Sequence, residues 1–135
     1  MIICWLSVCS MQMFNNRGWN EPGKEQLDKI PRLYETENTS LTGKLIYLHF
    51  FIFGSDWYIA EYDGDDIFFG FVILNQDYIN AEWGYISFQE LRDLNISGVE
   101  IDCEINWKPW PAEEIDKIKE CYKFKNMANK KESAV

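Results

Sequence analysis

Apolar residues in the middle of the chain come in short blocks that alternate with turn-forming residues, many of them acidic. The blocks at residues 44–53, 56–62, 67–74 and 81–86 are rich in aromatic and β-branched side chains, which favour extended backbone. The segment Asp63-Gly64-Asp65-Asp66 is typical of a tight hairpin turn, because Asp-Gly readily adopts positive φ angles. Short connections force neighbouring strands to pair antiparallel. The pattern therefore predicts an antiparallel β-meander.

Two strands differ from a simple half-buried pattern. Residues 44–53 are apolar on both alternating faces, which predicts a strand that is central or covered on both sides. Residues 98–105 alternate apolar and acidic side chains, which predicts a half-exposed edge strand with a row of carboxylates facing water. The apolar members are Val99, Ile101, Cys103 and Ile105, and the acidic members are Glu100, Asp102 and Glu104.

Helical segments flank these strands. Residues 21–30 begin with an early proline, carry Leu27 and Ile30 on one face and end before Pro31. A capping box at residues 87–90 begins a short helix that reaches residue 94. Pro111 opens a C-terminal helix with a buried stripe of Ile115, Ile118 and Tyr122.

Together these elements predict an α+β fold with an antiparallel sheet of about five strands and helices packed on one face. A chain of 135 residues is long enough for one hydrophobic core, and we place that single domain at residues 21–126. Residues 1–20 are expected to be a poorly structured extension or the product of a start codon assigned too early, with Met11 or Met13 as alternatives to Met1. Residues 127–135 are expected to form a polar, frayed tail.

The formal net charge of −9 is concentrated in the predicted sheet. Residues 44–104 contain twelve Asp and Glu against two Lys and Arg. Such a field repels phosphate backbones, so direct nucleic-acid binding is not expected, whereas a basic protein surface or a cation is favoured. Solubility alone is the alternative explanation, since many soluble domains carry a net charge. The apolar run at residues 2–8 is too short to span a bilayer, so no membrane partner is expected.

The four cysteines lack the spacing of a zinc site. Cys4, Cys9, Cys103 and Cys121 form no C-x-x-C pair, and His49 is the only histidine. Free thiols in a reducing compartment are the simplest interpretation, which favours a cytoplasmic protein without a cofactor.

Several segments resemble a known family. They are Ile-Pro-Arg-Leu-Tyr-Glu-Thr-Glu at 30–37, residues 54–66, Phe-Phe-Gly-Phe at 68–71, Glu-Trp-Gly-Tyr-Ile-Ser at 82–87 and residues 101–109. In this order they resemble the bacterial family labelled domain of unknown function 2958, over roughly residues 28–116. That family is found on plasmids, conjugative elements and phage-related islands, so the resemblance implies an accessory protein of a mobile element. It supplies no established catalytic residues, and its members begin shortly before the Pro-Arg-Leu-Tyr segment, so residues 1–20 depart from it.

A carboxylate cluster at the predicted hairpin leaves a catalytic alternative open. Grouped oxygen ligands could hold Mg²⁺ or Ca²⁺, as a metal-dependent hydrolase or nuclease would need. His49, with Glu61 or Glu82 opposite, could add general acid–base catalysis, although a lone histidine on a strand is more often a packed residue. No Lys-rich wall accompanies the cluster, and Asp-Gly turns are common without metal. The candidate metal ligands are Glu61, Asp63, Asp65, Asp66, Glu82 and His49.

The aromatic residues make up 16% of the chain, and most of them are assigned to the core. Proteins that stack single-stranded bases pair their rings with basic grooves, whereas this sheet is acidic. Trp107 and Trp110 flank Pro109 and are predicted to be exposed anchors for a protein partner.

The leading hypothesis is therefore a non-enzymatic protein that binds an unidentified partner with a basic surface. The predicted interaction residues are Asp63, Asp65, Asp66, Glu100, Asp102, Glu104, Trp107 and Trp110. One specific form is inhibition of a host nucleic-acid-binding defence enzyme, with carboxylates taking the place of phosphates. A small-ligand or regulatory module in conjugation is a further alternative.

Overall fold

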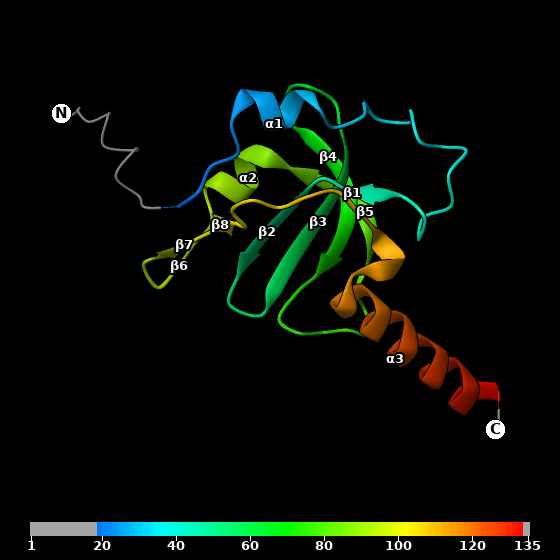
Figure 1. Cartoon of the computed structure of the whole chain (residues 1–135). Helices are drawn as coiled ribbons and strands as arrows, with labels where there is room; N and C mark the ends of the chain where they lie inside the picture. Colours follow the sequence, from blue (N-terminus) through cyan, green and yellow to red (C-terminus); the bar gives the residue numbers. More distant parts are fainter. Residues whose placement is uncertain (1–18, 134–135) are drawn as a thin grey trace.

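The central element is a five-stranded antiparallel sheet with the strand order β5-β4-β3-β2-β8 (Figure 1). The computed structural model describes residues 19–133. The strands are β2 (Leu48–Ile52), β3 (Ser55–Tyr62), β4 (Ile67–Ile73), β5 (Glu82–Ser87) and β8 (Asp102–Cys103). The first four form the expected meander, and β8 returns to pair with β2. The predicted α+β class is confirmed.

Two predicted strands are interrupted. The segment 44–53 divides at Tyr47 into β1 (Leu45–Ile46) and β2, and β1 pairs with β9 (Trp110–Pro111). The segment 98–105 divides into β7 (Val99–Glu100), which pairs with β6 (Asn95–Ile96), and β8. Ile101 and Cys103 are buried as expected, but Val99 and Ile105 are exposed. Each segment divides because it serves two sheets.

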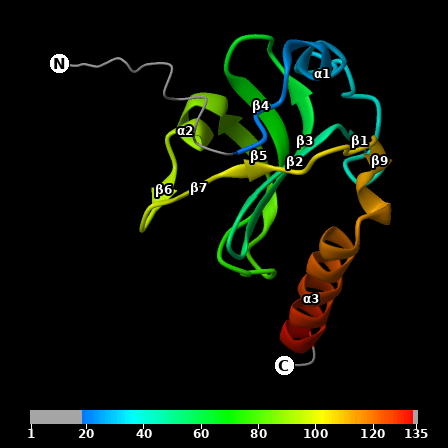
Figure 2. The same cartoon turned by 60° about the vertical axis from the view of Figure 1, so that its left-hand side comes forward.

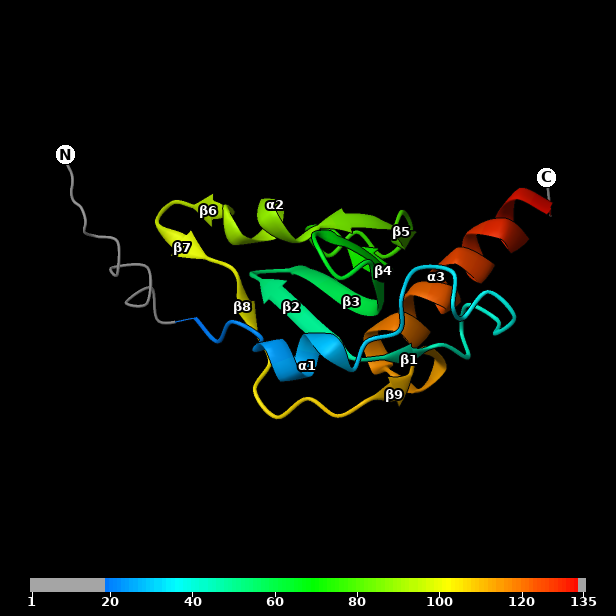
Figure 3. The same ribbon diagram turned by 90° about the horizontal axis from the view of Figure 1, so that it is seen from above.

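The helices lie on both faces of the sheet, which differs from the expected placement on one face. α1 (Lys24–Asp28) and α2 (Phe88–Arg92) lie on one side, while the 3₁₀ helix η2 (Ala112–Glu114) and α3 (Asp116–Ser133) lie on the other. Figure 2 shows α2 and α3 on opposite sides of the strands, and Figures 2 and 3 both show the end of α3 projecting beyond them. The strands are apolar on both faces, so both faces need a cover.

Each face has its own core cluster. On the α2 side, the Phe68 ring lies 5.7 Å from the Phe50 ring and 5.0 Å from the Phe88 ring. On the α3 side, Ile118 is buried and Tyr122 is half-buried in the cluster that contains Phe71, as the predicted helix stripe requires. The predicted start of this helix at Pro111 is wrong, because α3 begins at Asp116 and Ile115 precedes it in extended backbone. These two clusters hold most of the aromatic residues of the described chain, as predicted, whereas Phe53 and Tyr85 in the predicted strand segments are exposed.

A β-bulge in β3 changes which residues face the α3 side. Ile59 pairs with Gly70 and Glu61 pairs with Phe69, so Ala60 is an extra residue in β3. Because of this extra residue, Ala60 and Glu61 both face the side of the sheet that packs against α3. A Cβ at Gly70 would lie 2.1 Å from the carbonyl oxygen of Tyr58. The absence of a side chain at Gly70 therefore permits the bulge that directs Glu61.

The domain extends slightly beyond the predicted limits of 21–126. Trp19 packs against the core near Phe50, and Asn20 donates a hydrogen bond from its N–H to Asp102 (2.8 Å). At the other end, α3 continues to Ser133. The predictions for residues 1–18, including Cys4, Cys9 and the alternative start codons, lie outside the described residues. In the described part of the chain, no helix is long and apolar enough to cross a membrane.

Candidate functional site

The acidic β3–β4 hairpin uses its carboxylates to hold the turn. Asp63 Oδ1 accepts hydrogen bonds from the N–H groups of residues 65–67 at 2.8–3.0 Å. These bonds, the one from Asp65 above all, hold the pKa of Asp63 below its usual value. Asp66 accepts the Ser87 hydroxyl (2.7 Å) and the Gln89 N–H (2.8 Å) at the start of α2. Asp63 and Asp66 therefore act in local structure.

The candidate metal ligands are divided among separate places. Glu61 faces the α3 side of the sheet, whereas Glu82 pairs with Val72 near the opposite end of the strands. Within residues 19–133, no group of three or more His, Cys, Asp or Glu is placed to hold a metal ion. The geometry gives the metal-dependent hydrolase no support.

His49 belongs to a network that the sequence did not predict. Its Nδ1 lies 2.8 Å from Glu104 Oε1, and its Nε2 lies 2.7 Å from Asp56 Oδ1. Lys117 on α3 donates to Asp56 Oδ2 at 2.9 Å. Both ring nitrogens of His49 are therefore engaged by carboxylates within the fold.

Asp56 is almost completely buried at 1% exposure, and its charge is stabilised by this network. Burial alone would raise the pKa of Asp56, but the hydrogen bonds and charges of His49 and Lys117 outweigh burial and lower it. The His49 ring also stacks on Tyr58, with 4.4 Å between ring centroids. This network therefore ties α3 to β2 and β3. The sequence signal for this network is Asp56, a carboxylate beside the apolar residues of β3.

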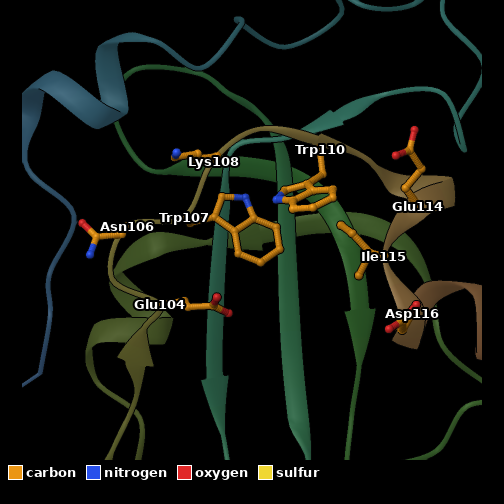
Figure 4. Close-up of a pocket in the computed structure, with 8 residues that line it drawn as sticks. All are labelled: Glu104, Asn106, Trp107, Lys108, Trp110, Glu114, Ile115 and Asp116. Atoms are coloured by element: carbon orange, nitrogen blue, oxygen red, sulfur yellow. The ribbon is translucent and has the colours of Figure 1, made fainter.

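Trp107 and Trp110 line a groove of about 350 Å³, which we call the tryptophan groove. Trp107 is half-buried, and its Nε1–H donates to the carbonyl oxygen of Ile46 (2.8 Å). Trp110 is 48% exposed. Figure 4 shows the two indole rings side by side, with Ile115 beside the Trp110 ring. The groove thus combines one fixed ring with one exposed ring.

Carboxylates from three elements surround these rings. Glu104 follows β8, Glu114 ends η2 and Asp116 begins α3. Figure 4 shows them on both sides of the indoles, while the Lys108 ammonium points away from the rings. The Glu114 and Asp116 side chains are exposed, so their charge acts on the solvent side of the groove. The sequence prediction did not include either residue.

The predicted interaction surface is brought together only in part. Glu104, Trp107 and Trp110 converge on the tryptophan groove. The remaining residues lie elsewhere: Asp63, Asp65 and Asp66 at the β3–β4 turn, Glu100 in β7, and Asp102 in β8, where it binds Asn20.

A second recess lies between residues 34–44 and strands β3, β4 and β5. It has a volume of about 360 Å³, and we call it the Lys44–Glu61 pocket after the ion pair at its floor. Tyr34 and Tyr85 form part of its wall. The sequence prediction included Glu61 but assigned it to the hairpin cluster.

Cys103 and Cys121 are free and buried. Burial raises the pKa of the Cys103 thiol to about 12 and that of the Cys121 thiol to about 11. Both thiols are therefore protonated near neutral pH, as is typical of buried structural cysteines.

Comparison with protein-family models, with curated proteins and with solved structures gives no match for this chain. The resemblance to the domain of unknown function 2958 family therefore stays a prediction.

Proposed function

We propose that this protein acts by binding a basic segment of a partner protein in the tryptophan groove. The observation that carries the proposal is the placement of two indole rings among three carboxylates, with Trp110 exposed. Indole faces attract ammonium and guanidinium groups, and nearby carboxylates add direct electrostatic attraction. Trp and Arg are also the residues most enriched at the energetic centres of protein interfaces.

The partner in this proposal is a nucleic-acid-binding enzyme of the host. A basic segment of that enzyme, which otherwise contacts phosphates, would bind among the carboxylates of the groove. The charge of the sheet region supports this choice, and so does the resemblance to a mobile-element family, because such elements meet host defence enzymes. The proposed site of action is the cytoplasm, which agrees with the free thiols of Cys103 and Cys121.

A direct test is titration of the protein with a short Arg- and Lys-rich peptide, followed by tryptophan fluorescence and calorimetry. We expect binding that weakens as NaCl is raised, because the attraction between exposed charges is screened. Trp110→Ala is expected to weaken binding by about tenfold or more, as expected for a central aromatic anchor. Glu114→Gln is expected to weaken it by several-fold.

The matched control is Glu113→Gln. Glu113 is exposed on the same 3₁₀ helix and carries the same charge, but it does not line the groove. An equal loss of peptide affinity in the Glu113→Gln and Glu114→Gln variants would show that net charge, and not the groove, determines binding. If peptide binding did not depend on salt and were unchanged in Trp110→Ala, the groove would not be the binding site.

The host-enzyme form of the proposal has its own test. A partner captured from the host should lose its affinity for duplex DNA when this protein is added. The Trp110→Ala variant should compete less well. A captured partner that still binds DNA fully while bound to the protein would contradict the proposed mimicry.

A further inference from the structure

We propose that the Lys44–Glu61 pocket binds an uncharged ring compound with several hydroxyl groups, of which a monosaccharide is the simplest example. This site is separate from the tryptophan groove and does not depend on the proposed partner.

The floor of the pocket is a buried ion pair. Lys44 Nζ lies 3.8 Å from Glu61 Oε2, and each side chain is only 5% exposed. Removing two charges from water costs several kcal/mol, and their mutual attraction often does no more than offset this cost. Fold stability is therefore a weak explanation for the pair. Ionisable groups held in this way inside a recess are typical of functional sites.

Thr36 joins the two charged groups. Glu61 accepts hydrogen bonds from the N–H of Tyr34 (3.0 Å), the N–H of Thr36 (3.2 Å) and the Thr36 hydroxyl. Lys44 donates to the carbonyl oxygen (2.5 Å) and the hydroxyl (2.7 Å) of Thr36. Burial would raise the pKa of Glu61, but these bonds and Lys44 lower it below its usual value. The floor is therefore a preorganised pair with no net charge.

The charge balance points to an uncharged ligand. The paired ammonium and carboxylate cancel at the floor, and Glu37 adds a single carboxylate to the lining. Phosphates and other anions are disfavoured by Glu37 and by the acidic sheet behind it. A neutral ligand is free of this repulsion.

The wall supplies aromatic rings and hydroxyl groups together. Tyr34 and Tyr85 are 63% and 58% exposed, and their hydroxyl oxygens lie 3.4 Å apart. The Phe69 ring lies 5.2 Å from the Tyr85 ring. Thr39 and Ser40 add two more hydroxyl groups. A sugar ring offers the matching chemistry, because its C–H face stacks on aromatic rings and its hydroxyls both donate and accept hydrogen bonds.

Tyr34 is held in a backbone conformation that a non-glycine residue seldom adopts. Its φ angle is 72°, and Glu61 accepts the N–H of this same residue. Such conformations persist where the surroundings enforce them, and ligand clamps are one such place. Glu61 at the floor of the pocket thus helps to position Tyr34 in its wall.

The test uses the full chain with a panel of neutral monosaccharides, each examined by saturation-transfer NMR and by shifts of the protein amide signals. We expect millimolar binding by at least one sugar, with the largest shifts at residues 34–44 and 82–87. The absence of binding by every sugar would overturn the proposal. So would shifts confined to other segments, or stronger binding by nucleotides than by the sugars.

Variants at Tyr85 separate binding from folding. Tyr85→Ala removes an exposed wall and is expected to weaken sugar binding by about tenfold or more while leaving the melting temperature nearly unchanged. Tyr85→Phe keeps the ring and removes one hydroxyl, so a loss of about two- to tenfold is expected. Phe124→Ala removes an exposed ring of α3 and serves as the control. Sugar binding that is equally strong in Tyr85→Ala would overturn the assignment.

Discussion

The tryptophan groove and the Lys44–Glu61 pocket use carboxylates in opposite ways. In the groove, the Asp116 side chain is 99% exposed, and its Oδ1 lies 3.7 Å from Lys119 Nζ. In the pocket, the Glu61 side chain is 5% exposed and is surrounded by the donors of Tyr34, Thr36 and Lys44. The charge of Asp116 is therefore available to a partner, whereas the charge of Glu61 organises the protein itself. An acidic composition alone does not distinguish these two roles.

The two sites are also physically connected. The carbonyl oxygen of Lys44 accepts the N–H of Ala112 (2.9 Å), and that of Thr42 accepts the N–H of Glu113 (2.8 Å). Figure 3 shows β1 and β9 side by side at this connection. The segment that closes the pocket is thus bonded to the helix that presents Glu114 to the groove.

The largest expected difference between the two sites concerns stability. Glu61→Ala leaves Lys44 buried without its counter-charge and removes the acceptor of two backbone N–H groups. We expect a loss of about 3–5 kcal/mol in the free energy of unfolding, measured by urea denaturation. Glu114→Ala, the exposed counterpart in the groove, should change this free energy by less than about 0.5 kcal/mol. Similar losses in both variants would remove the distinction between the sites.

The bulge offers a way to disturb the pocket selectively. Gly70→Ala would place a Cβ against the Tyr58 carbonyl oxygen, and relief of this clash should cost about 1–3 kcal/mol. Amide NMR signals around Glu61 and Tyr34 should shift more than those around Trp110. Gly84→Ala is the control, because its Cβ would meet no heavy atom within 4 Å. Equal effects of the two glycine variants would show that the bulge does not depend on Gly70.

Acid should act on the network behind the groove through Asp56. The pKa of Asp56 is lowered in the folded state, so its stabilising contribution is complete above the ordinary value of 3.8. That contribution is lost as the pH falls below 3.8 and through the lowered folded pKa. Asp56→Asn should cost about 1–3 kcal/mol at neutral pH and should flatten the acid limb of stability against pH. An unchanged acid limb in this variant would show that other carboxylates determine it.

The smallest effect is expected for Glu104, which belongs to both the groove and the His49 network. Its side chain is 49% exposed, so Glu104→Gln should reduce stability by only about 0.2–1 kcal/mol. The same change should still weaken binding of the basic peptide, with a smaller salt dependence than the wild-type protein shows. Peptide binding and stability can be measured on one preparation. If Glu104→Gln greatly reduced stability but left peptide binding unchanged, Glu104 would act in stabilising the fold and not in binding the peptide.

Local features of the sequence determined most of the sheet and the start of α2. Blocks of aromatic and β-branched residues and the Asp63-Gly64 turn were sufficient for β3 and β4, because a hairpin needs only neighbouring residues. Ser87 was recognised as a helix cap, and its hydroxyl oxygen accepts the Glu90 N–H at 3.2 Å. Trp107 and Trp110, selected because they flank Pro109, do meet in one groove, although Trp107 is half-buried rather than exposed. In each case the signal and the contact lie within a few residues of each other.

The tertiary structure alone decided which carboxylates act outward and which are internal. The bulge at Ala60 directs Glu61 towards Thr36, which lies in a distant loop, and strand register places Asp56 beside His49. The tertiary structure also decided that helices cover both faces of the sheet. The apolar pattern of a strand shows that a face must be covered, but it does not show which helix covers it. Register, bulges and helix docking depend on contacts between distant segments. Local patterning predicts the strands but not these contacts.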